Sequence, residues 1–230
     1  MKQLVLKLAP PPPPTLENFV VGANAETLAG VRALLQGRAG ERFLYLWGGR
    51  GCGKSHLATG FVHGARALGL STAWLTPGRD ALDVPALAAH DAVVVEDVER
   101  FDDAAQVALF DLVNRLREGT GLMLVTGCMP PRQLSLRPEL ATRLGQGLVY
   151  QVHGLSDADK EQALMAHARA RGFILAPEVA AYLLRSWRRD LPSLMALLDA
   201  LDRHSLVVKR PITLPLVREV LGALTNGKKP

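Results

Sequence analysis

Two hydrophobic periods follow one another along the chain, and the change between them predicts two domains. Five short apolar runs, each bounded by glycine or polar residues, indicate buried strands at 43–47, 72–75, 91–95, 121–126 and 148–152. Segments with apolar residues at helical spacing separate these runs, which favours a parallel sheet; helices are expected at about 22–36, 53–68, 85–89, 104–118 and 137–143. From Gly154 onward only the helical period remains, with helices expected at about 157–171, 177–188, 191–207 and 214–224. The pattern therefore predicts an α/β domain with a five-stranded parallel sheet flanked by helices, followed by a small all-helical domain.

A glycine-rich turn joins the first of these strands to the helix that follows it. The run from Gly48 to Ser55 matches the pattern G-x-x-x-x-G-K-[ST]. Glycines let a phosphate approach several backbone N–H groups at once, and the following helix adds free N–H groups and the positive end of its dipole. We therefore expect this turn to bind the phosphates of a nucleotide, with Lys54 at the terminal phosphates and the Ser55 hydroxyl on Mg²⁺. The residues of the expected site are Gly48, Gly49, Arg50, Gly51, Cys52, Gly53, Lys54, Ser55 and His56.

A second group of polar residues is expected at the carboxyl edge of the same sheet. The β-branched run 93–95 ends in Glu96 and Asp97, and the strand at 121–126 ends in Thr126. In open α/β sheets, ligands bind at the carboxyl ends of the strands. Glu96 is expected to hold Mg²⁺ through water, Asp97 to polarise the attacking water, and Thr126 to sense the γ-phosphate.

The helix expected at 104–118, between the third and fourth predicted strands, is amphipathic. Val107, Phe110, Val113 and Leu116 recur at helical spacing, so we expect them to face the core.

Composition limits the class of protein without naming a partner. The chain has 230 residues, a formal net charge of +5 and only two cysteines, Cys52 and Cys128. Its length suits one domain with a small appendage, and it has neither an apolar run of about 20 residues nor the apolar region of a signal peptide. Because Cys52 lies inside the glycine-rich turn, which a disulfide would obstruct, we expect reduced thiols and a cytoplasmic protein without membrane contact. The basic residues are scattered, so the charge permits contact with nucleic acid without indicating it.

The first residues form a short apolar peptide followed by a proline spacer. Leu4, Leu6 and Leu8 alternate, so an extended backbone places them on one face. The unbroken prolines at 10–14 are typical of a semi-rigid polyproline II spacer. Two interpretations stay open: the leucine face binds a partner, or the segment adds an edge strand to the α/β domain.

The order of the predicted features along the chain resembles that of an AAA+ ATPase. A strand leads into the phosphate loop, and then come a strand that ends in acids, a strand that ends in Thr126 and a helical domain. The loop GGRGCGKSHL, the segment TLENFVVG at 15–22 and the run RLGQG at 143–147 resemble the DnaA-like replication initiators. The N-terminal QLVLKL and the segments LSDADKEQAL, RARGF and ITLPLVREVL look most like the Hda family, which inactivates the initiator after replication starts. The resemblance covers almost the whole chain. It implies a clamp-binding peptide at 1–9, a spacer at 10–15, an AAA+ domain at 16–153, a helical lid domain at 154–225 and a polar tail at 226–230.

The resemblance also implies roles for individual residues and partners. Gln3, Leu4, Leu6 and Leu8 would dock on the DNA polymerase sliding clamp (its beta subunit), which would tether the protein indirectly to DNA. Phe19, Val20 and Val21 would lie on the adenine side of a bound ADP or ATP with its Mg²⁺. Arg143 would act as an arginine finger on the ATP of a neighbouring DnaA, because a guanidinium stays charged and donates in a fork to phosphoryl oxygens. The chain would thus stimulate hydrolysis by DnaA and inactivate it; self-association into a homo-oligomer stays open.

Three positions depart from the family pattern. Glu96 stands where the motif usually has Asp, Cys128 stands near the first sensor where initiators often carry an acid, and Pro192 replaces the second-sensor arginine. Since proline cannot contact phosphate, the lid should sense the nucleotide poorly, unless Arg188 or Arg189 substitutes for the missing arginine. We therefore expect tight binding of nucleotide, preferably ADP, with little hydrolysis by the chain alone. Two other functions stay open: a DNA-dependent AAA+ ATPase such as a helicase loader, and a nucleotide-gated scaffold in which Arg143 has no role.

Overall fold

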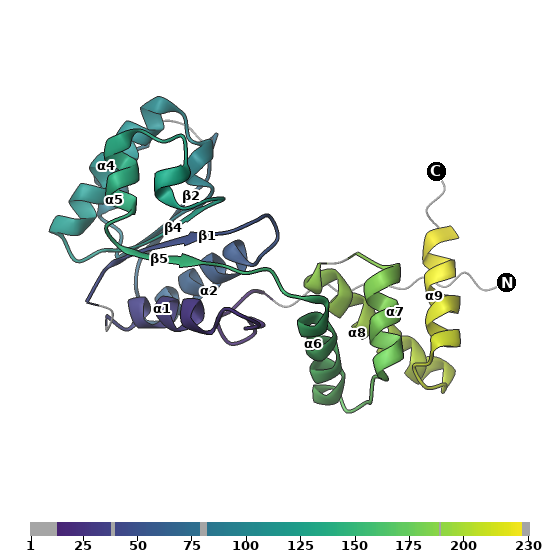
Figure 1. Cartoon of the computed structure of the whole chain (residues 1–230). Coiled ribbons are helices and arrows are strands. Elements are labelled where there is room, and N and C mark those ends of the chain that lie inside the picture. The colour runs from purple at the N-terminus through teal and green to yellow at the C-terminus, as the bar shows by residue number, and fades with distance from the viewer. Residues whose placement is uncertain (1–12, 38–39, 79–81, 189, 227–230) are drawn as a thin grey trace. The chain divides into compact units, whose positions relative to one another are not determined.

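The computed structural model describes residues 13–37, 40–78, 82–188 and 190–226 (Figure 1). The chain divides into two compact units, an α/β domain at 14–154 and a helical domain that begins at Leu155. The expected clamp-binding residues Gln3, Leu4, Leu6 and Leu8 lie outside the described residues, as does most of the proline run.

The α/β domain is built on five parallel strands, which confirms the predicted sheet. In space the strands follow the order β2-β3-β4-β1-β5, with β1 between β4 and β5. Trp47 at the end of β1 lies opposite Gly127 of β4 and Gln151 of β5, so the carboxyl ends of these three strands are aligned. The strands span Phe43–Trp47 (β1), Thr72–Leu75 (β2), Ala92–Val95 (β3), Leu122–Gly127 (β4) and Leu148–Gln151 (β5).

Helices cover both faces of this sheet (Figure 1). Because successive strand residues point to opposite faces, each strand contributes to two cores. Leu44 and Leu46 pack with α1 and α2 on one side, and Phe43 and Tyr45 with α4 and α5 on the other. The helical elements span Ala25–Leu35 (α1), Lys54–Ala67 (α2), Val84–Ala88 (α3), Asp103–Glu118 (α4) and Pro138–Leu144 (α5), with short 3-10 turns at Val98–Arg100 (η1) and Pro131–Gln133 (η2).

One predicted core position in α4 is wrong. Val107 is 52% exposed, whereas the buried stripe of the helix runs through Leu109, Leu112, Val113 and Leu116. Leu109, Leu112, Val113 and Leu116 form a continuous apolar stripe at helical spacing, and Val107 lies outside it. The helix packs this stripe against the sheet, which leaves Val107 exposed.

The helical domain has its own core and its own end caps. Leu164, Leu183, Leu194 and Val217 are fully buried within it. Ser156 and Asp159 form a reciprocal capping box, in which each side chain accepts a hydrogen bond from the backbone N–H of the other. Its helices span Asp157–Ala170 (α6), Pro177–Ser186 (α7), Leu191–Val208 (α8) and Leu214–Asn226 (α9).

Candidate nucleotide-binding site

The glycine-rich turn begins where three strands end. The backbone N–H of Gly48 donates to the carbonyl of Gly127 at the end of β4, at 3.3 Å. A Cβ added at Gly48 would lie 2.4 Å from the carbonyl oxygen of Val152, just beyond β5. Only glycine fits between these two strand ends, so the sheet itself fixes the start of the loop.

The rest of the loop opens toward solvent and turns into α2. Gly51 and Gly53 have φ angles of 75° and 115°, in the left-handed region that favours glycine. A Cβ at Gly49 would meet no atom within 4 Å, so the loop has an open side. Gly53 begins α2 without a side-chain cap, which leaves the first backbone N–H groups of the helix available to an anion.

Two side chains at the start of α2 are placed to bind a nucleotide and its metal. The amino group of Lys54 donates to the carbonyls of Gly48 and Gly49, at 2.7 and 3.1 Å. The exposed Ser55 hydroxyl makes no hydrogen bond within the described part of the chain, so it can bind a ligand. Within that same part, no group of three or more His, Cys, Asp or Glu residues could hold a metal ion. A Mg²⁺ ion bound together with a nucleotide would take most of its oxygen ligands from phosphate and water, and the exposed Ser55 hydroxyl fits one remaining protein ligand.

The acidic residues expected beside the loop follow β3, and one of them meets the expected sensor. The backbone N–H of Asp97 donates to the hydroxyl of Thr126 at 3.1 Å, and Thr126 is only 1% exposed. Asp97 adopts a left-handed φ of 47°, and its carboxylate lies 3.5 Å from the Arg100 guanidinium. Glu96 is half-buried and continues the ladder of β3 through its N–H, which donates to Leu75 at 2.9 Å.

Sequence reasoning missed a further acid at this edge, Glu99. One of its carboxylate oxygens accepts from the backbone N–H of Cys128 at 3.1 Å, and the other is buried with no partner among the described residues. Burial raises the pKa of the Cys128 thiol, and its hydrogen bond to Glu99 raises it further. Burial, and then Glu99, also raise the pKa of Tyr45, whose hydroxyl donates to Met129. The only signal in the sequence was an acid three positions after Glu96, a spacing that does not separate buried from exposed positions.

The segment before α1 packs against the start of α2. Phe19 is 8% exposed, and its ring meets that of His56 edge-on with centroids 5.3 Å apart. The imidazole of His56 contacts the carbonyl of Thr15 and the side-chain oxygen of Asn18, both at 2.9 Å. Burial lowers the pKa of His56. The structure thus places Phe19 and His56 beside Gly53, where a Cβ would lie 3.0 Å from the Phe19 ring.

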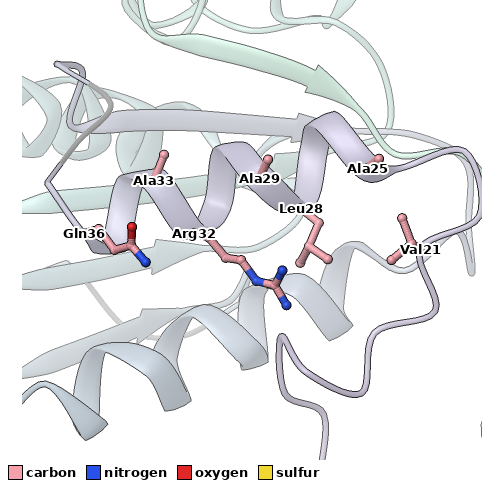
Figure 2. Close-up of a pocket in the computed structure, with 7 residues that line it drawn as sticks. All are labelled: Val21, Ala25, Leu28, Ala29, Arg32, Ala33 and Gln36. Carbon is pink, nitrogen blue, oxygen red and sulfur yellow. The ribbon is translucent and has the colours of Figure 1, made fainter.

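Val20 and Val21 follow Phe19 and are both half-buried. Val21 lines a shallow groove of about 510 Å³ on α1 (Figure 2). The groove carries one charged side chain, Arg32, which donates to the carbonyl of Leu16 at 3.0 Å. The remaining lining residues are Ala25, Leu28, Ala29, Ala33 and Gln36.

Arg143 lies away from this site. It is near the amino ends of the strands, whereas the phosphate loop follows the carboxyl end of β1. Arg143 lies in the last turn of α5, and its guanidinium donates to the side-chain oxygen of Gln146 at 3.2 Å. The loop that follows leads into the amino end of β5, where Leu148 pairs with Leu44 of β1. Arg143 as a whole is half-buried, and its guanidinium carbon lies 5.9 Å from the ring centroid of Phe110.

The comparison with protein families identifies the helical domain. Residues 157–221 match the family model described as Hda, lid domain. The helical domain is therefore similar to the lid domain of Hda. This confirms the resemblance to Hda that the sequence predicted. In this domain, Pro192 is exposed in the first turn of α8, where Asp190 caps the helix by accepting from the N–H of Ser193.

Solved structures establish the fold of the whole chain. Domain III of the replication initiation protein DnaA from Thermotoga maritima matches with a TM-score of 0.71 and 20% identity, over 96% of this chain and 100% of that one. AMPPCP-bound DnaA from Aquifex aeolicus has a TM-score of 0.70 and 19% identity, over 86% and 70%. The RuvB Holliday junction branch migration motor from Thermotoga maritima has a TM-score of 0.67 and 18% identity, over 92% and 72%. The predicted AAA+ fold with a helical lid is therefore confirmed. Within the described residues, no helix has the length and apolar character to cross a membrane.

Proposed function

We propose that this chain is a nucleotide-bound AAA+ adaptor that docks on the sliding clamp and stimulates ATP hydrolysis by DnaA, which inactivates the initiator. The observation that carries the proposal is the placement of Arg143. It lies at the amino edge of the sheet, whereas the phosphate loop lies at the carboxyl edge. The two edges are about 15 Å apart for a strand of this length. Arg143 therefore suits a phosphate held by a neighbouring subunit better than a phosphate held by its own loop.

Nucleotide binding by the chain itself is supported by the loop geometry. The left-handed glycines, the uncapped start of α2 and the Lys54 amino group together form a cradle for phosphates. The DnaA structure from Aquifex aeolicus, which shares the fold, contains the nucleotide analogue AMPPCP. We propose ADP or ATP with Mg²⁺ as the ligand here, with Ser55 and Glu96 toward the metal and residues 19–21 toward the adenine.

The proposed adaptor hydrolyses its own nucleotide slowly. Asp97 is partly engaged by Arg100, and the lid has a proline at 192 where an arginine would sense the phosphate. The proposed role of the bound nucleotide, preferably ADP, is to stabilise the α/β domain, which carries Arg143.

Clamp docking rests on the sequence alone. Gln3, Leu4, Leu6 and Leu8 form the proposed docking peptide, and a short peptide by itself buries little surface. A clamp ring with several identical pockets would raise the effective concentration of the tethered protein near DNA. Changing both Gln3 and Leu4 to Ala should abolish co-purification with the clamp while nucleotide binding is kept.

The decisive experiment measures ATP hydrolysis by DnaA with and without this protein and DNA-loaded clamp. Stimulation by the wild-type chain and its loss in Arg143→Ala, with ADP and clamp binding unchanged, are the expected results. Arginine fingers contribute about 10³–10⁵ in rate, so the loss should be nearly complete. Unchanged stimulation by Arg143→Ala would favour a nucleotide-gated scaffold. Strong turnover by the chain alone on single-stranded DNA would instead indicate a DNA-dependent ATPase such as a helicase loader.

A further inference from the structure

Arg143 shares its hydrogen-bond acceptor with a second arginine. Arg117, near the end of α4, donates to the side-chain oxygen of Gln146 at 2.9 Å, and Arg143 donates to the same atom at 3.2 Å. Both guanidinium groups therefore donate to the same neutral oxygen atom. The two arginines come from different helices, 26 positions apart in sequence, so nothing in the local pattern predicted the pair.

Each guanidinium is also held over an aromatic ring. Arg117 lies 5.1 Å from the ring centroid of Phe43, at the start of β1. Arg143 lies 5.9 Å from that of Phe110, on α4. Stacking of this kind orients the planar fork and leaves donors on its edge for another ligand. The two cations are thus positioned by the fold before any partner binds.

The charge of the pair is not compensated. Among the residues that the structure describes, no carboxylate forms an ion pair with Arg117 or Arg143. On the same helix, by contrast, Arg115 is paired with Asp111 at 3.0 Å. Two like charges held together repel each other, and an amide dipole offsets only part of this repulsion. A bound oxyanion with two or more charges would relieve it.

We propose that Arg117, Gln146 and Arg143 form one anion site for the polyphosphate of the ATP on the neighbouring subunit. Arg117 is a second phosphate-binding residue, and Gln146 is a positioning residue that keeps both forks on the same side. This inference rests on the proposed function, since it names a further contact of the arginine finger. Bidentate guanidinium groups suit phosphoryl oxygens, and two of them can share the charge that develops on the transferred group.

The first test compares stimulation of DnaA hydrolysis by four proteins: the wild type, Arg143→Ala, Arg117→Ala and the matched control Arg115→Ala. Arg117→Ala should lower the maximal stimulated rate about tenfold or more, as expected for a lost charged contact in the transition state. The protein concentration for half-maximal stimulation should stay within about twofold of wild type, and Arg117→Lys should restore part of the rate. Arg115→Ala should behave as wild type.

The outcomes separate this inference from the proposed function. If Arg143→Ala abolishes stimulation while Arg117→Ala does not change it, the two-arginine site is wrong and the adaptor function stands. If Arg117→Ala raises only the half-maximal concentration, Arg117 contacts the partner protein rather than the phosphates, which also overturns the inference. If the wild type gives no stimulation, the proposed function fails.

A second measurement tests the site without any partner. Inorganic tripolyphosphate is titrated into the Lys54→Ala protein, whose own phosphate loop is disabled, and binding is followed by NMR shifts. Binding should be lost when Arg117→Ala is added, and also with Gln146→Glu, which places a carboxylate between the two cations. It should persist when Arg115→Ala is added. Equal binding by all of these proteins would overturn the site, whatever the result with DnaA.

Discussion

The amino group of Lys54 lies 2.7 Å from the carbonyl oxygen of Gly48, so the helix that follows the phosphate loop is tied back to the first residue of that loop. A second contact, to Gly49 at 3.1 Å, holds the ammonium over the open side of the turn. When a phosphate binds in the loop, its charged oxygen would replace these neutral carbonyls as the acceptor of the Lys54 amino group. The lysine therefore both closes the loop and supplies the charge that retains a nucleotide.

Replacing Lys54 should remove that retention. Lys54→Ala is expected to weaken ADP binding roughly 100-fold, since hydrogen bonds between charged groups contribute about 1.5–3 kcal/mol each. Isothermal titration of the purified protein measures the effect. Arg66→Ala is the matched control, because Arg66 is an exposed cation on the same helix that contacts Thr72 instead. Equal losses in both variants would show that overall charge, and not the position of the amino group, determines binding.

The two glycines that open the loop should differ sharply in tolerance. Gly48→Ala places a Cβ 2.4 Å from the Val152 carbonyl, so the loop or the end of β5 must move. Overpacking of this kind lowers the free energy of unfolding by about 1–3 kcal/mol. Gly49→Ala meets no atom within 4 Å and should change that free energy by less than about 0.5 kcal/mol. Urea unfolding of the two variants checks this, and similar values for both would contradict the packing around Gly48.

Much of the fold follows from the alternation of apolar runs and helical periods. All five strands lie where short apolar runs were bounded by polar residues or glycine, because a parallel sheet covered on both faces needs uniformly apolar strands. The phosphate loop was predictable for a similar reason, since Gly48 has no space for a Cβ and Gly51 and Gly53 adopt left-handed φ angles. Local physics determines these features, so local sequence reveals them.

Features that depend on residues distant in sequence were not predictable. Asn24 exchanges two hydrogen bonds with the backbone of His153, at 2.9 and 2.7 Å, across 129 positions of the chain. The shared acceptor Gln146 and the buried carboxylate of Glu99 are further examples. Val107 shows the same limit within one helix, because its burial depended on which stripe of α4 the sheet would accept. Contacts between residues that are distant in sequence determine each of these features. The periodicity of apolar residues along the chain does not reveal such contacts.

The contact between Asp97 and Thr126 should control the position of the acid. Thr126→Val keeps the shape of the side chain but removes the acceptor of the Asp97 N–H. Leaving that partly buried donor unpaired should lower the free energy of unfolding by about 1 kcal/mol, the lower end of the range for buried groups. The Asp97 amide should also exchange its hydrogen faster, which NMR can follow directly. Thr126→Ser keeps the hydroxyl and should protect the amide as in the wild type; rapid exchange in that variant would contradict the assignment.

His56 should make the stability of the α/β domain depend on pH. Burial lowers its pKa from the ordinary value of 6.5, so the unfolded chain takes up a proton at a pH where the folded chain does not. The free energy of unfolding should therefore be at its full value above about pH 6.5 and fall as the pH drops below it, until the lower pKa of the folded state is reached. His56→Gln keeps an N–H donor for the Thr15 carbonyl and cannot be protonated. The free energy of unfolding of this variant should therefore fall less than that of the wild type between pH 7.5 and 5.5, which lie roughly one unit above and below the ordinary pKa of histidine. Urea unfolding at both values measures this, with His63→Gln, an exposed histidine of the same helix, as the control that should retain the wild-type loss. An equal loss of stability in the wild type and in His56→Gln would show that another group is responsible for the acid sensitivity.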